Sequence, residues 1–205
     1  MGRLICIVGN SGVGKTTLVQ ALCAAGGFSC GLEQHVERPF QQLFSQSLQR
    51  YALVNQLDYL LLRAEQELQM RRNSQTGVLD GGLEQDFYIY TNLFYRKGYL
   101  SDVEYSLCER QYQFYRQVLP SPDLTVWLQA PIAIICERFS ARRRNFQITR
   151  LADLELVEQL LQAWMSDSPP FPLVAIDVSA EDPSYQKAIQ VILSILKTNP
   201  DKISL

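Results

Sequence analysis

The sequence has few of the residues that build metal sites, disulfide frameworks or membrane spans. Its 205 residues include one histidine, His35, and five cysteines, none of which form a CxxC pair. This scarcity argues against a zinc site and a disulfide framework, and we expect reduced cysteines. No apolar run approaches the ~20 residues that span a bilayer, and no signal peptide precedes the first apolar segment. We therefore expect a soluble, cytoplasmic protein.

Charge of one sign is not in marked excess either. The formal net charge is −2, charged residues make up 20% of the chain, and hydrophobic residues make up 47%. A nearly neutral protein has no overall attraction for nucleic acid or for an anionic membrane, so we expect neither as a partner and look for a local anion site. The length predicts one domain over residues 1–205 with a substantial core.

A local anion site is present near the amino terminus. The apolar run from Arg3 to Val8 predicts a buried strand, and a segment that fits GxxxxGK[ST] follows it directly. In this pattern the glycines let backbone N–H groups close around a phosphate, the lysine reaches the β and γ oxygens, and the following hydroxyl ligates Mg²⁺. The helix predicted from Thr16 to Ala25 directs its dipole at the same anion. We therefore assign ATP binding to Gly9, Asn10, Ser11, Gly12, Val13, Gly14, Lys15, Thr16 and Thr17.

Strand-like and helix-like segments alternate along the rest of the chain. Strands are expected at 28–32, 77–80, 124–128 and 171–178, and helices at 39–72, 83–96, 102–118, 132–141, 151–164 and 183–197. This order predicts an α/β, three-layer P-loop NTPase fold, in which a parallel sheet of five strands lies between helices.

Polar residues follow two of the predicted strands. Asp80 ends the strand at 77–80, a position that suits the ordering of Mg²⁺ beside the phosphate-binding loop. Glu33 follows the strand at 28–32, but its position alone favours a solvated loop residue. Gln56 and Arg63, seven residues apart, fall on nearly the same helix face, although an exposed polar face is the simpler interpretation.

A basic segment follows the helix predicted at 132–141. It contains Arg138 and the run from Arg142 to Arg144. A bare run of positive charge is usually a solvated surface. In a protein with a P-loop we favour a basic lid, about residues 138–150, that closes over transferring phosphates and supplies positive charge in the transition state.

Taken together, these motifs resemble the deoxynucleoside kinase family, which includes deoxyguanosine, deoxyadenosine, deoxycytidine and mitochondrial-type thymidine kinases. Family members carry GNxGxGK[ST] at the P-loop, a catalytic Glu in an ExxxxNPF-like loop, a YAxxxQ helix with an Arg seven residues later, and an RxxxRxR lid. The matching residues are Gly9 to Thr16, Glu33 with Pro39-Phe40, Tyr51-Ala52 with Gln56 and Arg63, and Arg138 with Arg142 and Arg144. The P-loop is generic to many NTPases, whereas the helix motif is much more specific.

The resemblance implies phosphorylation of a deoxynucleoside 5′-hydroxyl with ATP and Mg²⁺, a step of nucleotide salvage, by a homodimer that pairs through a helix bundle. The implied catalytic residues are Lys15, Glu33 as the base, Arg138, Arg142 and Arg144. Thr16 and Asp80 are the implied metal ligands, while Gln56, Arg63 and Asp86 are implied to read the base of a purine deoxynucleoside or deoxycytidine. Glu37 is a rival for the base because it stands closer to Pro39.

The chain also departs from the family pattern. The family's [DE]RS motif is Asp80-Gly81-Gly82 here, so the Arg that approaches the catalytic Glu and the 5′-oxygen is absent. Ser45 and Gln147 stand where the family places a Tyr and a Glu that hold the sugar 3′-hydroxyl. Two alternatives therefore stay open: a nucleotide-binding protein with little or no kinase activity, and a related P-loop kinase for another nucleoside or nucleotide.

Overall fold

The computed structural model describes residues 2–31, 38–141, 149–167, 171–180 and 184–198. Across these ranges, five parallel strands form one sheet in the order β2-β3-β1-β4-β5. The strands are β1 (Leu4–Gly9), β2 (Phe28–Gly31), β3 (Thr76–Asp80), β4 (Leu124–Gln129) and β5 (Leu173–Asp177). The predicted fold class is therefore confirmed.

The central strand β1 shows why the sheet forms where it does. All six of its residues are buried, because helices cover both faces of the sheet. Leu4, Cys6 and Val8 belong to one hydrophobic cluster, whereas Ile5 and Ile7 belong to the other. Successive side chains of a strand point to opposite faces, so the one apolar run of β1 anchors both cores.

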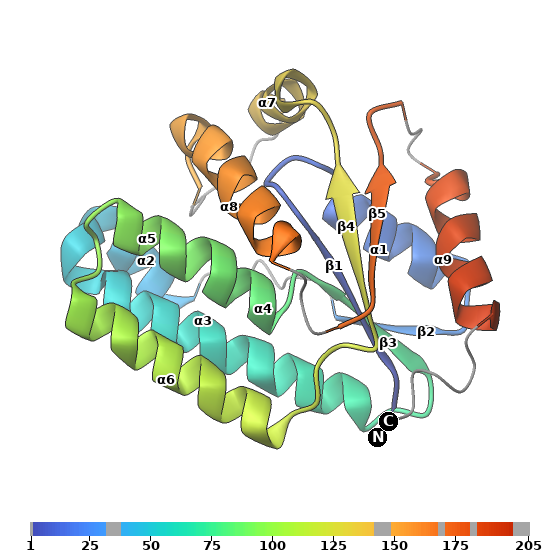
Figure 1. The fold of residues 1–205 in the computed structure, drawn as a ribbon, viewed down its shortest axis with the longest axis horizontal. Helices are drawn as coiled ribbons and strands as arrows, with labels where there is room; N and C mark the ends of the chain where they lie inside the picture. The colour runs from blue at the N-terminus through green and yellow to red at the C-terminus, as the bar shows by residue number, and fades with distance from the viewer. Residues whose placement is uncertain (1, 32–37, 142–148, 168–170, 181–183, 199–205) are drawn as a thin grey trace.

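Helices form the outer two layers. They are α1 (Lys15–Ala24), α2 (Pro39–Gln46), α3 (Leu48–Arg71), α4 (Leu83–Gln85), α5 (Asn92–Arg96), α6 (Asp102–Val118), α7 (Ile132–Ser140), α8 (Leu154–Ser166) and α9 (Gln186–Thr198). In Figure 1, α1 and α9 lie on one side of the sheet, while α3, α4 and α8 lie on the other, with α6 alongside α3. None of the helices in the described ranges is both long and apolar enough to cross a membrane.

Three predicted helices differ from the observed ones. The helix predicted at 39–72 is broken at Ser47, which has extended dihedrals (φ −151°, ψ 97°), because serine supports a helix interior poorly and a helix boundary well. The helix predicted at 83–96 contains a π-helical turn, η1 (Asp86–Thr91). The helix predicted at 151–164 opens with a short 3₁₀ turn, η2 (Leu151–Asp153).

The cysteines contradict a second prediction, that all of them are reduced. The structure joins Cys23 and Cys30 in a disulfide, whereas the sequence predicts reduced cysteines throughout. Cys23 lies near the end of α1 and Cys30 lies in β2, and the turn between them brings their Cα atoms to 6.3 Å, within the range that a disulfide spans. Sequence rules missed the pair because its spacing of seven matches no CxxC motif. Cys6, Cys108 and Cys136 are free thiols.

Candidate active site

The phosphate-binding loop joins the carboxyl end of β1 to the start of α1. Gly14 has φ +114°, and a Cβ atom there would stand 1.9 Å from the Tyr185 hydroxyl, so only glycine fits this position. Lys15 Nζ donates to the backbone carbonyls of Gly9 at 2.9 Å and Asn10 at 3.0 Å. The lysine is therefore held over the loop, and the first amides of α1 face the same side.

Three side chains from distant elements hold this loop in place. The Gly9 N–H donates to Gln85 Oε1 at 3.0 Å, and Asn10 Nδ2 donates to Glu158 Oε2 at 2.9 Å. The Ser11 hydroxyl donates to the hydroxyl of Thr149 at 3.2 Å. No spacing in the sequence signals these partners, because they meet only after the sheet and its helices have assembled.

Thr16 and Asp80 form the arrangement that fits Mg²⁺. The Thr16 hydroxyl donates to Asp80 Oδ2 at 2.5 Å, and Asp80 is 1% exposed at the end of β3. Its second carboxylate oxygen, Oδ1, is buried and accepts no hydrogen bond. A hydroxyl and a carboxylate beside a phosphate loop are the oxygen ligands that Mg²⁺ takes together with phosphates and waters. An unpaired buried carboxylate oxygen fits a cation at this position.

Gln56, Arg63 and Asp86 form a second buried polar group. Arg63 Nε donates to Asp86 Oδ2 at 2.5 Å, and Gln56 Nε2 donates to the Asp86 carbonyl at 3.0 Å. The three residues are between 1% and 4% exposed, which excludes a solvated helix face. Arg63 Nη1 also donates to Gln66 Oε1 and to the Asp80 carbonyl. The structure therefore brings together the three residues implied to read the base.

The π-helical turn η1 explains how Asp86 accepts hydrogen bonds from three side chains. Its backbone carbonyl accepts hydrogen bonds from Gln56 Nε2 and from the Thr91 hydroxyl, while its carboxylate accepts from Arg63. The wider turn of a π-helix leaves this carbonyl accessible to side chains. Such turns are uncommon inside helices and occur frequently at functional sites.

Gly81 stands where the family resemblance implies an arginine. It has φ +88°, a conformation that side-chain-bearing residues rarely adopt. A Cβ atom there would lie 3.2 Å from Arg63 Nη2, so the Arg63 guanidinium occupies the space beside this backbone. A guanidinium therefore lies beside Gly81, and it comes from Arg63 of α3.

Two other predicted residues have local partners. Arg138 donates to the carbonyls of Val13, Val178 and Ser179, so in this structure it ties the phosphate-binding loop to the end of β5. Ser45 is exposed on α2 and donates to the Gln42 carbonyl, one turn back in its own helix. The remaining predicted residues, Glu33, Glu37, Arg142, Arg144 and Gln147, lie outside the described residues.

Comparison with known proteins decides the family. A family model described as "Deoxynucleoside kinase" matches residues 5–197. The chain belongs to the deoxynucleoside kinase family. It is 23% identical over 207 residues to a deoxyadenosine/deoxycytidine kinase of Bacillus subtilis, which covers 97% of this chain and 95% of the relative. It is 22% identical over 186 residues to a deoxyguanosine kinase of the same organism, which covers 87% of each.

A solved structure confirms the family fold. A deoxyadenosine kinase from M. mycoides, whose structure is described with the products dCMP and a flexible dCDP bound, superposes with a TM-score of 0.78 at 20% identity. The match covers 95% of this chain and 99% of that protein. The members of this family are phosphotransferases that use a nucleotide as phosphate donor.

Proposed function

We propose that the chain uses ATP and Mg²⁺ to phosphorylate the 5′-hydroxyl of a deoxynucleoside. The observation that carries the proposal is a continuous set of contacts from the phosphate-binding loop to the buried polar group. Thr16 contacts the Asp80 carboxylate, the Asp80 carbonyl accepts from Arg63, and Arg63 pairs with Asp86. Phosphoryl transfer requires positioning and charge stabilisation more than covalent chemistry, and this arrangement supports both.

Each part of the site has one role in this proposal. Lys15 leaves the carbonyls of Gly9 and Asn10 to contact a phosphate, while the loop amides hold the rest of the triphosphate. Thr16 and Asp80 hold Mg²⁺, which when bound neutralises charge on the phosphate oxygens. The proposed base Glu33 and the lid residues Arg142 and Arg144 complete the site.

The base Glu33 has a rival in Glu37, and paired variants separate them. Glu33→Gln keeps the size of the side chain but removes the proton acceptor, so we expect a large fall in kcat with little change in nucleoside Kd. Glu37→Gln serves as the control and is expected to keep most of the activity. The opposite result, a fall in kcat for Glu37→Gln alone, would reverse the assignment.

The buried group Gln56, Arg63 and Asp86 favours certain bases. It offers an amide and a charged pair with fixed donors and acceptors, and a mismatched base leaves such groups unpaired at about 1–3 kcal/mol each. We propose that a purine deoxynucleoside binds best, deoxycytidine second and thymidine last, because the 5-methyl group of thymidine crowds the pair.

Competition among four deoxynucleosides tests both the reaction and the base preference. ATP consumption is measured with each deoxynucleoside alone and in pairs, on the natural chain and on Asp86→Ala. We expect turnover with a purine deoxynucleoside and a changed order of preference in the variant. The base assignment fails if thymidine binds best to the natural chain or if Asp86→Ala leaves the order unchanged.

Gly81 supports a second candidate function, nucleotide binding with little catalysis. Losing one charge-stabilising donor typically costs about 2.7–4 kcal/mol in a transition state. Calorimetric binding of ATP·Mg²⁺ without turnover on any deoxynucleoside would favour this function. Gly81→Arg is not a clean rescue, because the new side chain would start from φ +88° and meet the Arg63 guanidinium.

An exposed apolar stripe on α6 supports a homodimer. Val103 is 81% exposed, and Leu107, Phe114 and Val118 follow it at helical spacing with exposures of 40%, 58% and 55%. Their positions repeat along one side of the helix, as expected for a helix–helix contact. We propose that two copies pair through this stripe.

Light scattering should give twice the 23.4 kDa chain mass, and Phe114→Asp should give a monomer. A natural chain that scatters as 23.4 kDa would exclude the dimer.

A further inference from the structure

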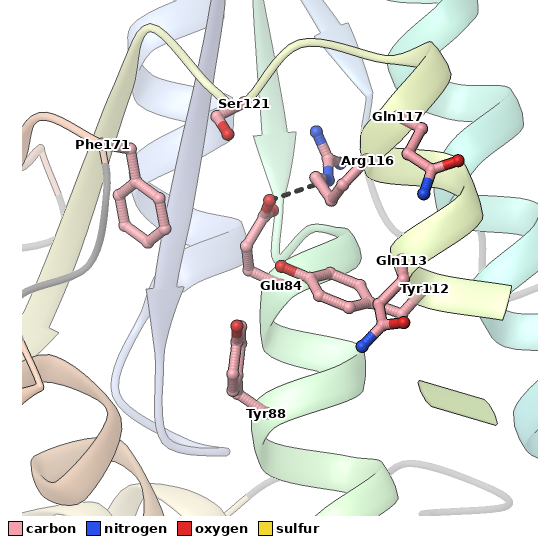
Figure 2. Close-up of a pocket in the computed structure, with 8 residues that line it drawn as sticks. All are labelled: Glu84, Tyr88, Tyr112, Gln113, Arg116, Gln117, Ser121 and Phe171. Atoms are coloured by element: carbon pink, nitrogen blue, oxygen red, sulfur yellow. Dashed lines mark ion pairs between the residues drawn. The ribbon is translucent and has the colours of Figure 1, made fainter. Parts of the chain in front are cut away.

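A cavity of about 280 Å³ lies on the α6 side of the sheet, away from the phosphate-binding loop. Its lining includes Glu84 of α4, Tyr88 of η1, Tyr112 and Arg116 of α6, and Phe171 (Figure 2). Ser121 and Phe171, which precede β4 and β5, place the cavity toward the amino ends of the strands. The phosphate-binding loop follows the carboxyl end of β1, so the cavity is separate from the candidate active site.

The positive and negative charges of the residues at the cavity do not cancel. Glu84 is 3% exposed, and neither of its carboxylate oxygens accepts a hydrogen bond. Its partner is Arg116, whose Nε lies 3.0 Å from Glu84 Oε1. Arg116 also pairs with Glu67 at 2.6 Å, while the nearby Arg71 pairs with Asp123. Two buried carboxylates thus share one guanidinium, and one negative charge is left over.

This excess charge has a measurable consequence for Glu84. Burial, together with the neighbouring Glu67, raises the pKa of Glu84 to about 7. A buried carboxylate without hydrogen bonds is unfavourable, and it is relieved either by a proton or by a ligand that donates. Because Figure 2 shows the carboxylate of Glu84 facing the cavity, such a ligand has room to approach it.

Aromatic rings form the walls around this carboxylate. The Tyr88 ring stacks on Trp164 at 5.4 Å and meets Tyr112 edge-on at 5.5 Å. Trp164 in turn meets Phe171 edge-on at 6.0 Å. These contacts fix the rings in place, so the cavity exists without rearrangement. Flat apolar walls around one acceptor favour a flat ligand with a donor edge.

We propose that this cavity binds an amino-substituted aromatic heterocycle, with an amino group beside a ring N–H. Two adjacent N–H groups match the two oxygens of Glu84 in a bidentate pair, and the ring lies between the walls of Tyr88, Tyr112 and Phe171. The volume is below the roughly 300–1,000 Å³ of pockets for drug-sized ligands, so the ligand is one or two fused rings and not a nucleoside triphosphate.

Two small probes test the donor edge directly. An NMR titration uses 2-aminopyridine in its protonated form, which carries an amino group beside a ring N–H. It is compared with pyridine, which has the same ring but no amino group, and the Arg116 Nε–H signal is followed as a reporter inside the cavity. We expect 2-aminopyridine to shift this signal and to bind at least tenfold more tightly than pyridine. Equal affinities for the two probes would overturn the proposal.

Variants decide whether Glu84 is the acceptor. Glu84→Gln keeps the size of the side chain but removes the carboxylate, and we expect at least a tenfold loss of 2-aminopyridine affinity. Glu109→Gln, a change on α6 outside the cavity lining, is the matched control and should bind normally. Unchanged affinity in Glu84→Gln would contradict the proposal, as would loss of binding in Gln56→Ala, which would place the probe at the base-reading group.

A third variant avoids the buried ion pairs altogether. Gln113 is exposed and lines the cavity, so Gln113→Trp is expected to fill the cavity mouth and block the probe while Glu84 and Arg116 keep their contact. Normal 2-aminopyridine binding in a folded Gln113→Trp protein would overturn the site. These experiments measure binding alone, so their failure and the absence of kinase turnover are independent results.

Discussion

Two arginines, the buried Arg63 and the partly buried Arg116, pair with buried carboxylates in different ways. Arg63 pairs with one carboxylate, Asp86, and gives a second donor to the neutral oxygens of Gln66 and the Asp80 backbone. Arg116 pairs with two carboxylates, Glu67 and Glu84. The first group is electrically balanced, whereas the second carries one extra negative charge.

Comparing the two groups shows how the net charge of a buried group affects its response to protons. In the Arg63 group every named acceptor is matched by a donor, so the pair is suited to hold a fixed geometry for a base. In the Arg116 group the unmatched carboxylate responds to protons, and burial raises the pKa of Glu84 to about 7. The two groups use the same residue types. A difference of one charge makes one suited to hold a fixed geometry and the other responsive to pH.

Removing Arg116 should have the largest effect on the free energy of unfolding. Arg116→Met would leave Glu67 and Glu84 buried without a cation, and stranding buried charges costs about 3–5 kcal/mol. We expect a loss of this size in the free energy of unfolding, measured with urea at pH 8, and a smaller loss at pH 5, where protonation removes charge. Arg96→Met, an exposed change on α5 outside the proposed dimer stripe, is the control. A loss that is equal at both pH values would argue against buried, charged carboxylates.

Neutralising Glu84 should change the pH dependence of stability. The folded pKa of about 7 lies above the ordinary value of 4.5, so the folded protein holds a proton that the unfolded chain releases between these values. Stability therefore falls as pH rises through this window, by about 3 kcal/mol for this group. In Glu84→Gln this fall should be absent. Thermal unfolding from pH 5 to pH 8 measures it, and parallel curves for the two proteins would exclude the assignment.

A substitution at Gly81 tests the Arg63 group, because the Gly81 backbone lies beside the Arg63 guanidinium. Gly81→Ala should cost about 1–2 kcal/mol in stability because of its positive φ, and the new Cβ should displace the Arg63 guanidinium. Gly98→Ala is a matched control, because Gly98 has φ +68° with no atom within 4 Å of its Cβ position. We expect both variants to lose similar stability and only Gly81→Ala to lose nucleoside affinity. Equal nucleoside affinities would separate Arg63 from the base-reading role.

Features encoded in adjacent residues were predictable from the sequence. The phosphate-binding loop, the strands and the spacing of Gln56 and Arg63 follow from local pattern, because glycine, branched residues and helical periodicity act over a few positions. The Ser101 capping box is equally local, because the Ser101 side chain accepts from the Glu104 N–H three residues on. The residue types alone suffice in each of these cases.

Features that depend on tertiary placement were not predictable. Glu84 and Arg116 are 32 positions apart, and a polar Leu-Glu-Gln-Asp segment gives no sign that its glutamate is buried. The contact of Gln85 with the Gly9 backbone joins elements 76 positions apart. The Cys23–Cys30 disulfide depends on the direction of the turn between them. Each of these arises only when packed elements bring distant residues together.

The partly exposed Glu104 should have the smallest effect on stability, and its pH dependence should have the opposite sign to that of Glu84. Its carboxylate accepts from the Ser101 backbone and hydroxyl at the start of α6, and these hydrogen bonds lower its pKa. A lowered folded pKa means that the unfolded chain binds the proton more readily, so this group stabilises the fold above its ordinary pKa and loses that effect as pH falls. Glu104→Gln should therefore cost about 0.3–1 kcal/mol near pH 7, as for other charges at a helix start, and less below pH 4. A pH profile of thermal unfolding measures both variants together: Glu84→Gln should gain on the natural chain as pH rises, whereas Glu104→Gln should fall behind it, and slopes of the same sign would show that burial does not separate the two carboxylates.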